Sequence, residues 1–395
     1  MNILLYGLPY AARKPKVRIM KRTVSAPVAH DELVSVVVPA CNVAATLDRC
    51  LASLEAQDHA CLEVLCLNDG STDATSEVAH AHAARDPRVI VVDKPNEGYG
   101  ATCNRGLGLA RGTWVALVEP DDWVEPWFVS SMLACADGLG GADAVDVVKA
   151  PYWRVFEDGR GRQTRVTCPY KGRVRPRRQP FAVGDGVELL RHHPAVWAAL
   201  YRRGYLRERH VSFVEAPGGG WVDNPFLVST LCGTGRIAYV DRCAYVYVER
   251  DLDEAEAMAA RNPTLPLERW NDAMDAAALV GVDDRRVLSA LALRGVNYAL
   301  ITVESAGMEA PGVEGLVRSS LERLPADVVW DDPGISPAGK RLFAQVRGLS
   351  VPHPALMGAR YGAHLAGEAA YRLLTNGPGF ALATARRRAA GGRVG

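Results

Sequence analysis

Short apolar segments alternate with amphipathic ones between Leu33 and Val118, and this alternation restricts the chain to few folds. Apolar, often β-branched runs predict buried strands at 34–38, 62–67, 89–92 and 115–118. Leu47, Leu51 and Leu54 at helical spacing predict a helix at 44–55, and further helices are expected from about 73 to 85 and through 107 and 109. Strands and helices that alternate at this spacing form a parallel sheet with right-handed crossovers. The predicted fold class is therefore α/β.

Polar clusters follow three of these strands, at Pro39–Asn42, Asn68–Asp73 and Glu119–Asp122. In an open parallel sheet, ligands bind outside the carboxyl ends of the strands. The third cluster carries three carboxylates, and like charges held close together raise one another's pKa. A divalent cation removes this penalty, and hard oxygen ligands suit Mg²⁺ or Mn²⁺. The alternative is an acidic turn that caps a helix beginning near Pro126; three clusters at three strand ends favour a ligand site.

Composition excludes several classes of protein. The chain has 395 residues with a formal net charge of +1, so no overall field favours nucleic acid. Nine cysteines without a CxxC pair are typical of free thiols in a reducing cytoplasm. No run reaches the roughly 18 uninterrupted apolar residues of a membrane helix. Charges follow, rather than precede, the apolar patch of residues 1–32, which predicts a poorly ordered extension and not a signal peptide.

The segment 143–250 continues the domain. A strand is predicted at Val145–Lys149, then a hairpin of Tyr152–Phe156 and Gln163–Thr167 around Asp158-Gly159. Another strand is predicted at Val196–Tyr201, and Ile237–Val248 has the alternation of a single strand. Residues 160–178 are rich in arginine without acids, which fits a solvated loop or a loop that meets a diphosphate or a phosphorylated lipid.

The last third of the chain is rich in alanine and leucine at helical spacing, so residues 251–375 are predicted as a helical C-terminal domain. Residues 376–395 are predicted as a flexible tail with arginines at 386–388 and 393. At ~1 kcal/mol for each basic residue near an anionic membrane, this tail supports marginal attachment only. A plain disordered tail is the simpler interpretation.

Four motifs together resemble the family-2 glycosyltransferases of the GT-A fold. They are SVVVPACN (35–42), LCLNDGSTD (65–73), NEGYGATCNRGLGLARG (96–112) and VEPDDW (118–123). The resemblance covers about 33–128 and implies a Rossmann-like, mostly parallel sheet with helices on both faces. It also implies transfer of a sugar from a nucleotide-diphosphate donor with inversion. On this reading residues 33–250 form the GT-A domain, with a nucleotide-sugar half (33–128) and an acceptor half (143–250).

The resemblance assigns roles to residues at the strand ends. The turn of Pro39, Ala40, Cys41 and Asn42, with Asp69 and Gly70, would hold the nucleotide base, while Asn96, Gly98 and Asn104 would lie beside the nucleotide. A carboxylate such as Asp69 accepts a ring N–H without a competing donor. Asn104 is equally compatible with a polar contact along its helix. In this family an aromatic residue stands where the chain has Cys41, so stacking on the base is absent there or supplied elsewhere.

The acidic cluster would bind the metal, Mn²⁺ or Mg²⁺, and the ribose. The resemblance makes Asp121 the direct ligand, Glu119 a ribose or outer contact of the metal beside Pro120, and Asp122 a supporting residue. The first acid of the family's DxD-like triplet is replaced by Glu119, which adds one methylene.

Asp223 is the predicted general base. The family places two acids before an aromatic residue here, and the second one acts as the base; in this chain Val222 replaces the first. One base opposite the leaving diphosphate is enough for an inverting displacement. The alternative is that Asp223 caps a helix with Pro225 in its first turn. Trp221 would stack on the acceptor sugar or pack in the core.

The prediction is a metal-dependent inverting glycosyltransferase of cell-surface polysaccharide synthesis, with a UDP-sugar as the first donor to test. Its acceptor would be a glycan or a lipid-linked sugar, in the cytoplasm or at the inner face of the membrane. The alternative is a non-catalytic nucleotide-sugar-binding or scaffold protein, because Cys41, Glu119 and Val222 each depart from the family pattern. The sequence leaves the oligomeric state open.

Overall fold

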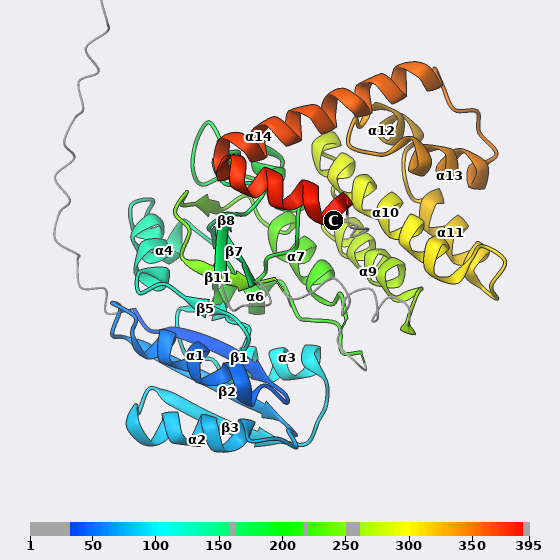
Figure 1. Cartoon of the computed structure of the whole chain (residues 1–395). Coiled ribbons are helices and arrows are strands. Elements are labelled where there is room, and N and C mark those ends of the chain that lie inside the picture. Colours follow the sequence, from blue (N-terminus) through cyan, green and yellow to red (C-terminus); the bar gives the residue numbers. More distant parts are fainter. Residues whose placement is uncertain (1–31, 158–162, 217–219, 250–260, 390–395) are drawn as a thin grey trace, which may run out of the picture.

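The computed structural model describes residues 32–157, 163–216, 220–249 and 261–389, with backbone alone from 378. The predicted N-terminal extension, the turn of the predicted hairpin and Arg393 lie outside these residues. Most of the fold is a mixed sheet and a smaller sheet, joined by a group of helices (Figure 1).

The larger sheet has seven strands in the order β10-β6-β9-β4-β1-β2-β3. Its first half confirms the predicted alternation, with strands β1 (Val34–Ala40), β2 (Leu62–Asp69), β3 (Val89–Lys94) and β4 (Trp114–Leu117). The intervening helices are α1 (Ala44–Glu55), α2 (Thr75–Arg85) and α3 (Tyr99–Leu109). These four strands are all parallel. The ends of β1, β2 and β4 therefore meet at one edge of the sheet.

Close packing of α3 on the sheet depends on Gly106. A Cβ at this position would lie 2.3 Å from Cγ1 of Val37, so any larger residue would push the helix away from β1. The glycines of α3 therefore help to fix the height of its N-terminus above the strand ends.

The rest of the large sheet comes from later in the chain. Strand β6 (Val147–Lys149) pairs in parallel with β10 (Ile237–Tyr239), and β9 (Ala199–Arg202) runs antiparallel between β6 and β4. Helices α4 (Phe128–Asp137), α6 (Arg203–Glu208) and α7 (Asp223–Cys232) lie between these strands along the chain, with short turns of helix η1 (Gly141–Asp143), η2 (Val183–Gly186) and α5 (Glu188–Arg191).

The smaller sheet has the order β5-β11-β7-β8, with β5 (Trp123–Val124), β7 (Tyr152–Glu157), β8 (Gln163–Thr167) and β11 (Tyr245–Val248). The antiparallel pair β7–β8 is the predicted hairpin. The prediction of one strand over Ile237–Val248 is wrong, because β10 and β11 belong to different sheets. The chain turns between them so that Tyr245 reaches the acidic cluster after β4, a long-range contact that the alternation of side chains does not encode.

Six helices follow: α9 (Leu265–Leu279), α10 (Arg285–Ala306), α11 (Val313–Glu322), α12 (Ala326–Asp331), α13 (Pro337–Arg347) and α14 (Pro354–Ala389). The predicted helical region is thus observed, and it packs on the acceptor half through α9 against α7 and α10 against α5. Residues 376–389 are helical, in contrast to the predicted flexible tail, although the helix breaks at Gly377 with φ of 77°.

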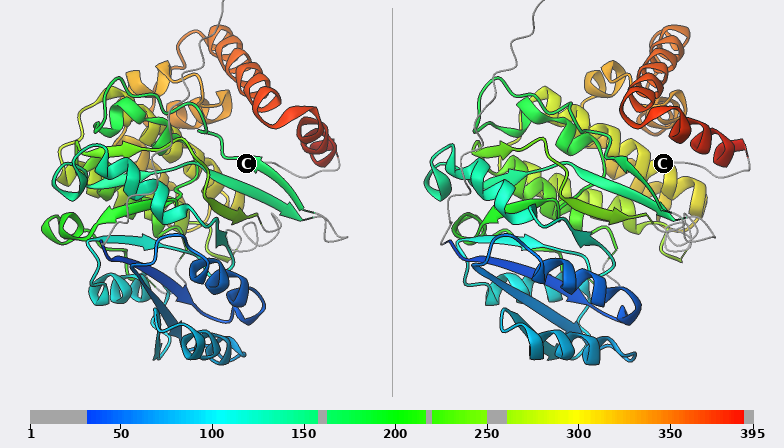
Figure 2. Two further views of the ribbon diagram at one scale, coloured as in Figure 1. Left: turned by 90° about the vertical axis from the view of Figure 1, so that its left-hand side faces the viewer. Right: turned by 60° about the vertical axis from the view of Figure 1, so that its left-hand side comes forward.

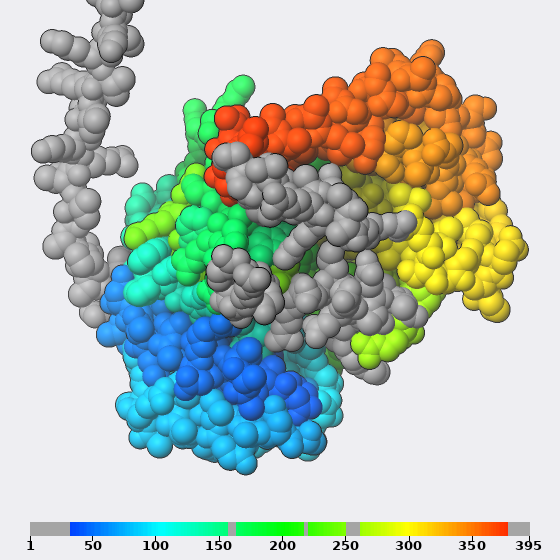
Figure 3. Space-filling model, in the orientation of Figure 1, coloured from blue at the N-terminus to red at the C-terminus, as the bar shows by residue number. Residues whose placement is uncertain are grey.

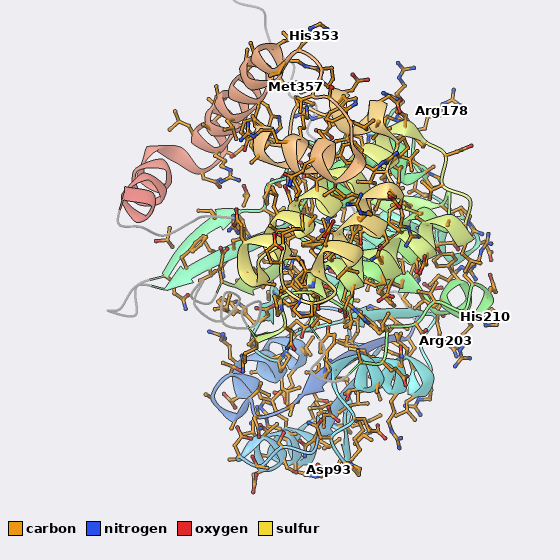
Figure 4. All side chains as sticks on the ribbon, turned by 90° about the vertical axis from the view of Figure 1, so that its right-hand side faces the viewer. Asp93, Arg178, Arg203, His210, His353 and Met357 are labelled. Atoms are coloured by element: carbon orange, nitrogen blue, oxygen red, sulfur yellow. The ribbon has the colours of Figure 1, made fainter. Side chains whose placement is uncertain are left out.

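Helix α14 crosses the outer side of the hairpin β7–β8 and forms a ridge on the surface (Figures 2 and 3). Arg173 makes two hydrogen bonds to the carboxylate of Glu368, of 2.7 and 3.0 Å, and its guanidinium lies 3.5 Å from the ring centroid of Tyr371. Arg178 lies at the outer surface (Figure 4). In the described part of the arginine-rich loop, Arg173 therefore anchors α14 and Arg178 is solvated, which favours the simpler interpretation of that loop.

Helix α10 is long and apolar enough to span a membrane by length and composition. Half of its apolar window is buried inside the protein, against α9, α11, α12 and α13. A buried core helix passes the same test, so this feature is weak evidence for a membrane segment.

Candidate active site

The turns after β1 and β2 are tied together by Asn42. Its backbone N–H donates to Oγ of Ser71 at 3.0 Å, and its Oδ1 accepts from the N–H of Thr72 at 2.8 Å. Asn42 has φ of 53°, a left-handed conformation that asparagine tolerates better than most residues. Pro39 and Ala40 end β1, and Cys41 beside them is exposed. The predicted turn is therefore present, without an aromatic side chain at position 41, and its contact with a base stays a prediction.

Asp69 is buried at the end of β2, with 3% of its surface exposed. Its carboxylate accepts hydrogen bonds from Nζ of Lys94 and from the backbone N–H groups of Glu97, at 2.8 Å, and Gly98, at 3.0 Å. Burial opposes ionisation, but the hydrogen bonds and the charge of Lys94 lower the pKa of Asp69 below its ordinary value. Asp69 is thus an ionised anchor for the loop 95–98, and its contact with a base stays a prediction.

The loop that Asp69 anchors brings Asn96 onto the first turn. The Asn96 amide donates to the carbonyl oxygen of Asp69 at 2.9 Å and to the sulfur of Cys41 at 3.3 Å. Gly70, with φ of +65°, lies so close to this loop that a Cβ would be 2.7 Å from the Asn96 nitrogen. Only glycine fits both the conformation and the space. The predicted residues after β1, β2 and β3 therefore form one connected surface.

Asn104, on α3, bonds to the segment that carries Phe213 and Glu215. Its Nδ2 donates to the carbonyl of Phe213 at 3.0 Å and to Glu215 at 2.9 Å, and its Oδ1 accepts from the N–H of Phe213. These contacts favour the helix-side polar role over contact with a nucleotide. Gly98 lies near the same loop, since a Cβ there would be 3.4 Å from the Ala216 carbonyl.

Glu119, two residues after the end of β4, is held by Tyr99 of α3. The Tyr99 hydroxyl donates to the Glu119 carboxylate, and the Tyr245 hydroxyl accepts from the Glu119 N–H at 3.0 Å. Burial and the nearby charge of Asp121 raise the pKa of Glu119 to about 8. A nearby cation would strongly favour the ionised form of a carboxyl group with this pKa.

Asp122 is bonded to strand β11. It is fully buried, and its two oxygens accept from the hydroxyl of Tyr245 and the N–H of Val248, both at 2.8 Å. Burial and the charge of Asp121 raise its pKa well above the ordinary value. Asp122 therefore joins the end of β4 to β11, which is the supporting position expected from the sequence.

The acidic cluster fits a divalent cation only together with another ligand. Among the residues that the structure describes, no three His, Cys, Asp or Glu side chains are grouped to hold a metal ion. Asp121 and Glu119 remain as hard oxygen donors, because Asp122 is engaged by β11. Mg²⁺ is commonly held by one or two carboxylates plus substrate phosphates and water. The two carboxylates of Asp121 and Glu119 fit a Mg²⁺ ion that is completed by substrate phosphates and water.

Asp223 is the first residue of α7, after Trp221 and the buried Val222. Trp221 has φ of 56°, which is unusual for a bulky residue and marks a constrained turn. Burial raises the pKa of the Asp223 carboxyl to about 6, although the charge of Arg294 opposes this rise. The N-cap position of α7 is Val222, and hydrogen bonds from the backbone N–H groups of Asp223 and Asn224 also lower the pKa of the Asp223 carboxyl. A carboxylate with a pKa near neutrality can take a proton from a substrate hydroxyl.

Asp223 and Glu119 line the same cavity of about 370 Å³. Aromatic side chains supply much of its wall, and they come from four parts of the chain: Tyr99, Trp197, Trp221 and Tyr298. Trp197 stacks on Tyr245 at 4.1 Å between ring centroids, which joins this wall to the support of Asp122. The predicted base and the predicted acidic cluster are thus brought to one cavity, from residues 104 positions apart in sequence.

A second hollow, of about 840 Å³, contains Asn96, Gly98 and Asn104. It lies between the loop before α3 and residues 215–216, so it adjoins the predicted nucleotide surface without including Asp69.

Sequence reasoning missed several residues of the site. Tyr99 lies inside a quoted motif and could have been found there. Trp197, Tyr245, His193 and Tyr298 carry no local signal, because their positions depend on how β9, β11 and α10 pack.

The comparison with known families agrees with this geometry. Residues 35–209 match the model of glycosyl transferase family 2. The putative glycosyltransferase EpsH of Bacillus subtilis is 32% identical over 181 residues, which are 46% of this chain and 50% of EpsH. The succinoglycan biosynthesis protein ExoO of Rhizobium meliloti is 32% identical over 243 residues, 58% of this chain and 66% of ExoO. The chain thus spans between half and about two thirds of these relatives.

Among solved structures, residues 1–349 of TarS from S. aureus, in complex with UDP-GlcNAc, resemble this chain with a TM-score of 0.61 and 18% identity. The match covers 84% of this chain and 92% of that one, so the likeness in fold extends into the helical region.

Proposed function

Residues 35–209 of this chain belong to glycosyl transferase family 2 on a GT-A fold, and we propose that the protein transfers a sugar from a nucleotide-diphosphate donor to an acceptor hydroxyl. The observation that carries this proposal is the shared cavity of Asp223 and Glu119. Because the two carboxyl groups share one cavity, this observation supports a base at Asp223 that acts near the acidic strand end, where a diphosphate would lie.

The chain's own residues would divide the reaction as follows. The turns at 39–42 and 69–70, with Asn96, hold the nucleotide. The aromatic cavity positions the acceptor, and Asp223 takes the proton from its hydroxyl group. The acceptor oxygen forms a bond to the anomeric carbon while the bond from that carbon to the diphosphate oxygen breaks, so the configuration inverts.

Asp121 and Glu119 would hold a Mn²⁺ or Mg²⁺ ion, which when bound offsets the negative charge that grows on the leaving diphosphate. Support comes from the pKa of Glu119, which burial and Asp121 raise to about 8. Placing a cation there would restore the ionised form of this carboxyl group.

The donor, the acceptor and the location are proposed from the related proteins and from the cysteines of this chain. A UDP-sugar is the first donor to test, because TarS of the same fold was solved with UDP-GlcNAc. A glycan or lipid-linked acceptor of a cell-surface polysaccharide is proposed from ExoO, which is named for succinoglycan biosynthesis. Cytoplasmic location follows from the proposed donor and from cysteines that are all free thiols.

The test is donor hydrolysis and transfer by the purified protein with a panel of UDP- and GDP-sugars, with Mn²⁺, Mg²⁺ or EDTA. We expect turnover of at least one donor that EDTA abolishes and added metal restores. Metal-dependent binding of a donor without any turnover would favour the non-catalytic alternative. The absence of both binding and turnover would reject the proposal.

A further inference from the structure

Helix α10 places a buried arginine behind the segment that carries Asp223. Arg294 has 8% of its surface exposed, and its guanidinium donates to Oδ1 of Asn224 at 2.6 Å and to the carbonyl oxygen of His192. Both acceptors are neutral. In the part of the chain that the structure describes, no carboxylate lies within ion-pair distance of Arg294. Burying a positive charge without a carboxylate partner costs free energy of folding, so this arginine is unusual for a purely structural residue.

The two acceptors of Arg294 each adjoin a residue that lines the aromatic cavity. Asn224 directly follows Asp223, and His192 directly precedes His193. Asn224 links Arg294 to this segment, because its Nδ2 donates to the Trp221 carbonyl oxygen and to Oδ1 of Asp223, both at 3.3 Å. The guanidinium therefore joins two segments that line the cavity: the one with Asp223, through Asn224, and the one with His193, through the carbonyl of His192.

Tyr298, one turn along α10, holds the same group. Its hydroxyl donates to Oδ1 of Asn224 at 3.2 Å, and its side chain lines the cavity. The helix is itself fixed in place, because a Cβ at Gly295 would lie 2.4 Å from the Trp270 ring of α9. Small movements of α10 are thus opposed by packing, and its two polar groups reach Asn224 from a rigid support.

We propose that Arg294 and Tyr298 are positioning residues, which hold Asp223 through Asn224 so that its carboxylate faces the acceptor, and that the helical region thereby completes the transfer site. This inference rests on the proposed function for the role of Asp223. It does not require that either residue touches substrate.

The electrostatics of the cavity agree with this role. The titratable groups that face Asp223 are Glu119, Tyr99 and His193 from the GT-A domain, and Tyr298 and Arg294 from α10. The charge of Arg294 lowers the pKa of Asp223, against the larger effect of burial. Arg294 thus favours the ionised form that a base needs, in addition to orienting it.

The first test compares Arg294→Met and Arg294→Lys with Arg318→Met, a control in which a surface arginine of α11 that bonds Glu314 is replaced. A displacement of Asp223 lowers kcat by roughly 10- to 100-fold and leaves the donor KM unchanged. The acid side of the kcat–pH profile also moves to higher pH in Arg294→Met. Lysine restores the charge, and with it the pH profile, more fully than the rate. Unchanged kcat and pH profile in a folded Arg294→Met protein overturn the proposal.

Two milder variants keep the test decisive where Arg294→Met fails to fold. Tyr298→Phe removes only the bond to Asn224, and we expect a loss of about 3- to 10-fold in kcat with an unchanged donor KM. Asn224→Ala removes the link itself, and Tyr298→Phe in that background has no further effect on kcat. Additive losses from the two variants overturn the link through Asn224.

Failure of the proposed function gives a different result. If the wild-type protein turns over no donor, the same cycle of Asn224→Ala and Tyr298→Phe is measured by urea unfolding. Non-additive losses of stability then confirm the contact, whereas the role in transfer is rejected together with the function. Additive losses reject the contact as well.

Discussion

The half of the GT-A domain proposed to bind the nucleotide and the half proposed to bind the acceptor are built in different ways. In residues 33–128 the predicted site residues bond to one another across neighbouring strand ends, as Asn42 does with Ser71 and Thr72, and Asp69 with the loop at Gly98. Around Asp223 the partners come from distant segments, and Arg294 lies 70 positions from Asn224. The proposed nucleotide site is therefore encoded in local motifs, whereas the proposed acceptor site depends on the packing of the helical region.

The largest effect is expected on transfer, from the acceptor side. Asp223→Asn removes the proposed base and should lower kcat by about 10²- to 10⁴-fold while donor affinity stays within a factor of two or so. Steady-state kinetics and calorimetric titration of the donor measure the two quantities. Asp241→Asn, in the same half but bonded to Lys171, is the matched control. Loss of donor binding in Asp223→Asn would assign this residue to structure.

At the acidic cluster, the largest expected effect is on donor binding and not on kcat. Asp121→Ala removes the proposed metal ligand, and we expect donor affinity in the presence of Mn²⁺ to fall by about 10- to 100-fold. Affinity without metal should change little, since the nucleotide turns are intact. If titrations with Mn²⁺ and with EDTA show equal losses, Asp121 does not act through a metal.

The anchor of the nucleotide loop should matter for stability. Asp69→Asn leaves the buried ammonium of Lys94 without its closest carboxylate, and we expect a loss of about 3 kcal/mol in the free energy of unfolding. Glu97→Gln removes the other, half-exposed partner of Lys94 and should cost less than about 1 kcal/mol. If urea unfolding shows equal losses of stability for the two variants, burial does not distinguish the Lys94–Asp69 pair from the Lys94–Glu97 pair.

A smaller and opposite effect on stability is expected at Asp223. Its pKa in the folded protein, about 6, is above the ordinary value of 3.8, so the folded state loses stability as pH rises between these values. Asp223→Asn removes this cost and should stabilise the protein by roughly 2 kcal/mol at pH 7, with no gain below about pH 4.

Asp241→Asn is the control of opposite sign, because the charge of Lys171 and hydrogen bonds outweigh burial and lower the pKa of Asp241. It should destabilise the protein at pH 7. A loss of stability at pH 7 in Asp223→Asn would contradict the raised pKa of Asp223.

Much of the fold could be predicted because periodicity reports burial directly. The helix at 44–55 and the strand at 163–167 begin and end where the sequence pattern places them. The prediction was wrong at Ile237–Val248, since alternation shows that a strand has one buried face but not which sheet it joins. The tail was misjudged at 376–389 because alanine, glycine and arginine are equally compatible with a solvated helix and with a disordered segment.

The sequence by itself determined the connected surface at the strand ends that we propose binds the nucleotide, because its turns and carboxylates follow strands whose parallel order brings their ends together. Only the tertiary structure decided which acids share a cavity. Asp122 is turned toward Tyr245 and Val248, while Glu119 lies with Asp223 among aromatic rings. It also decided that α10 supports the proposed base through Arg294. The physical reason is that burial and charge compensation depend on contacts between segments far apart in the chain, which no local pattern of residues records.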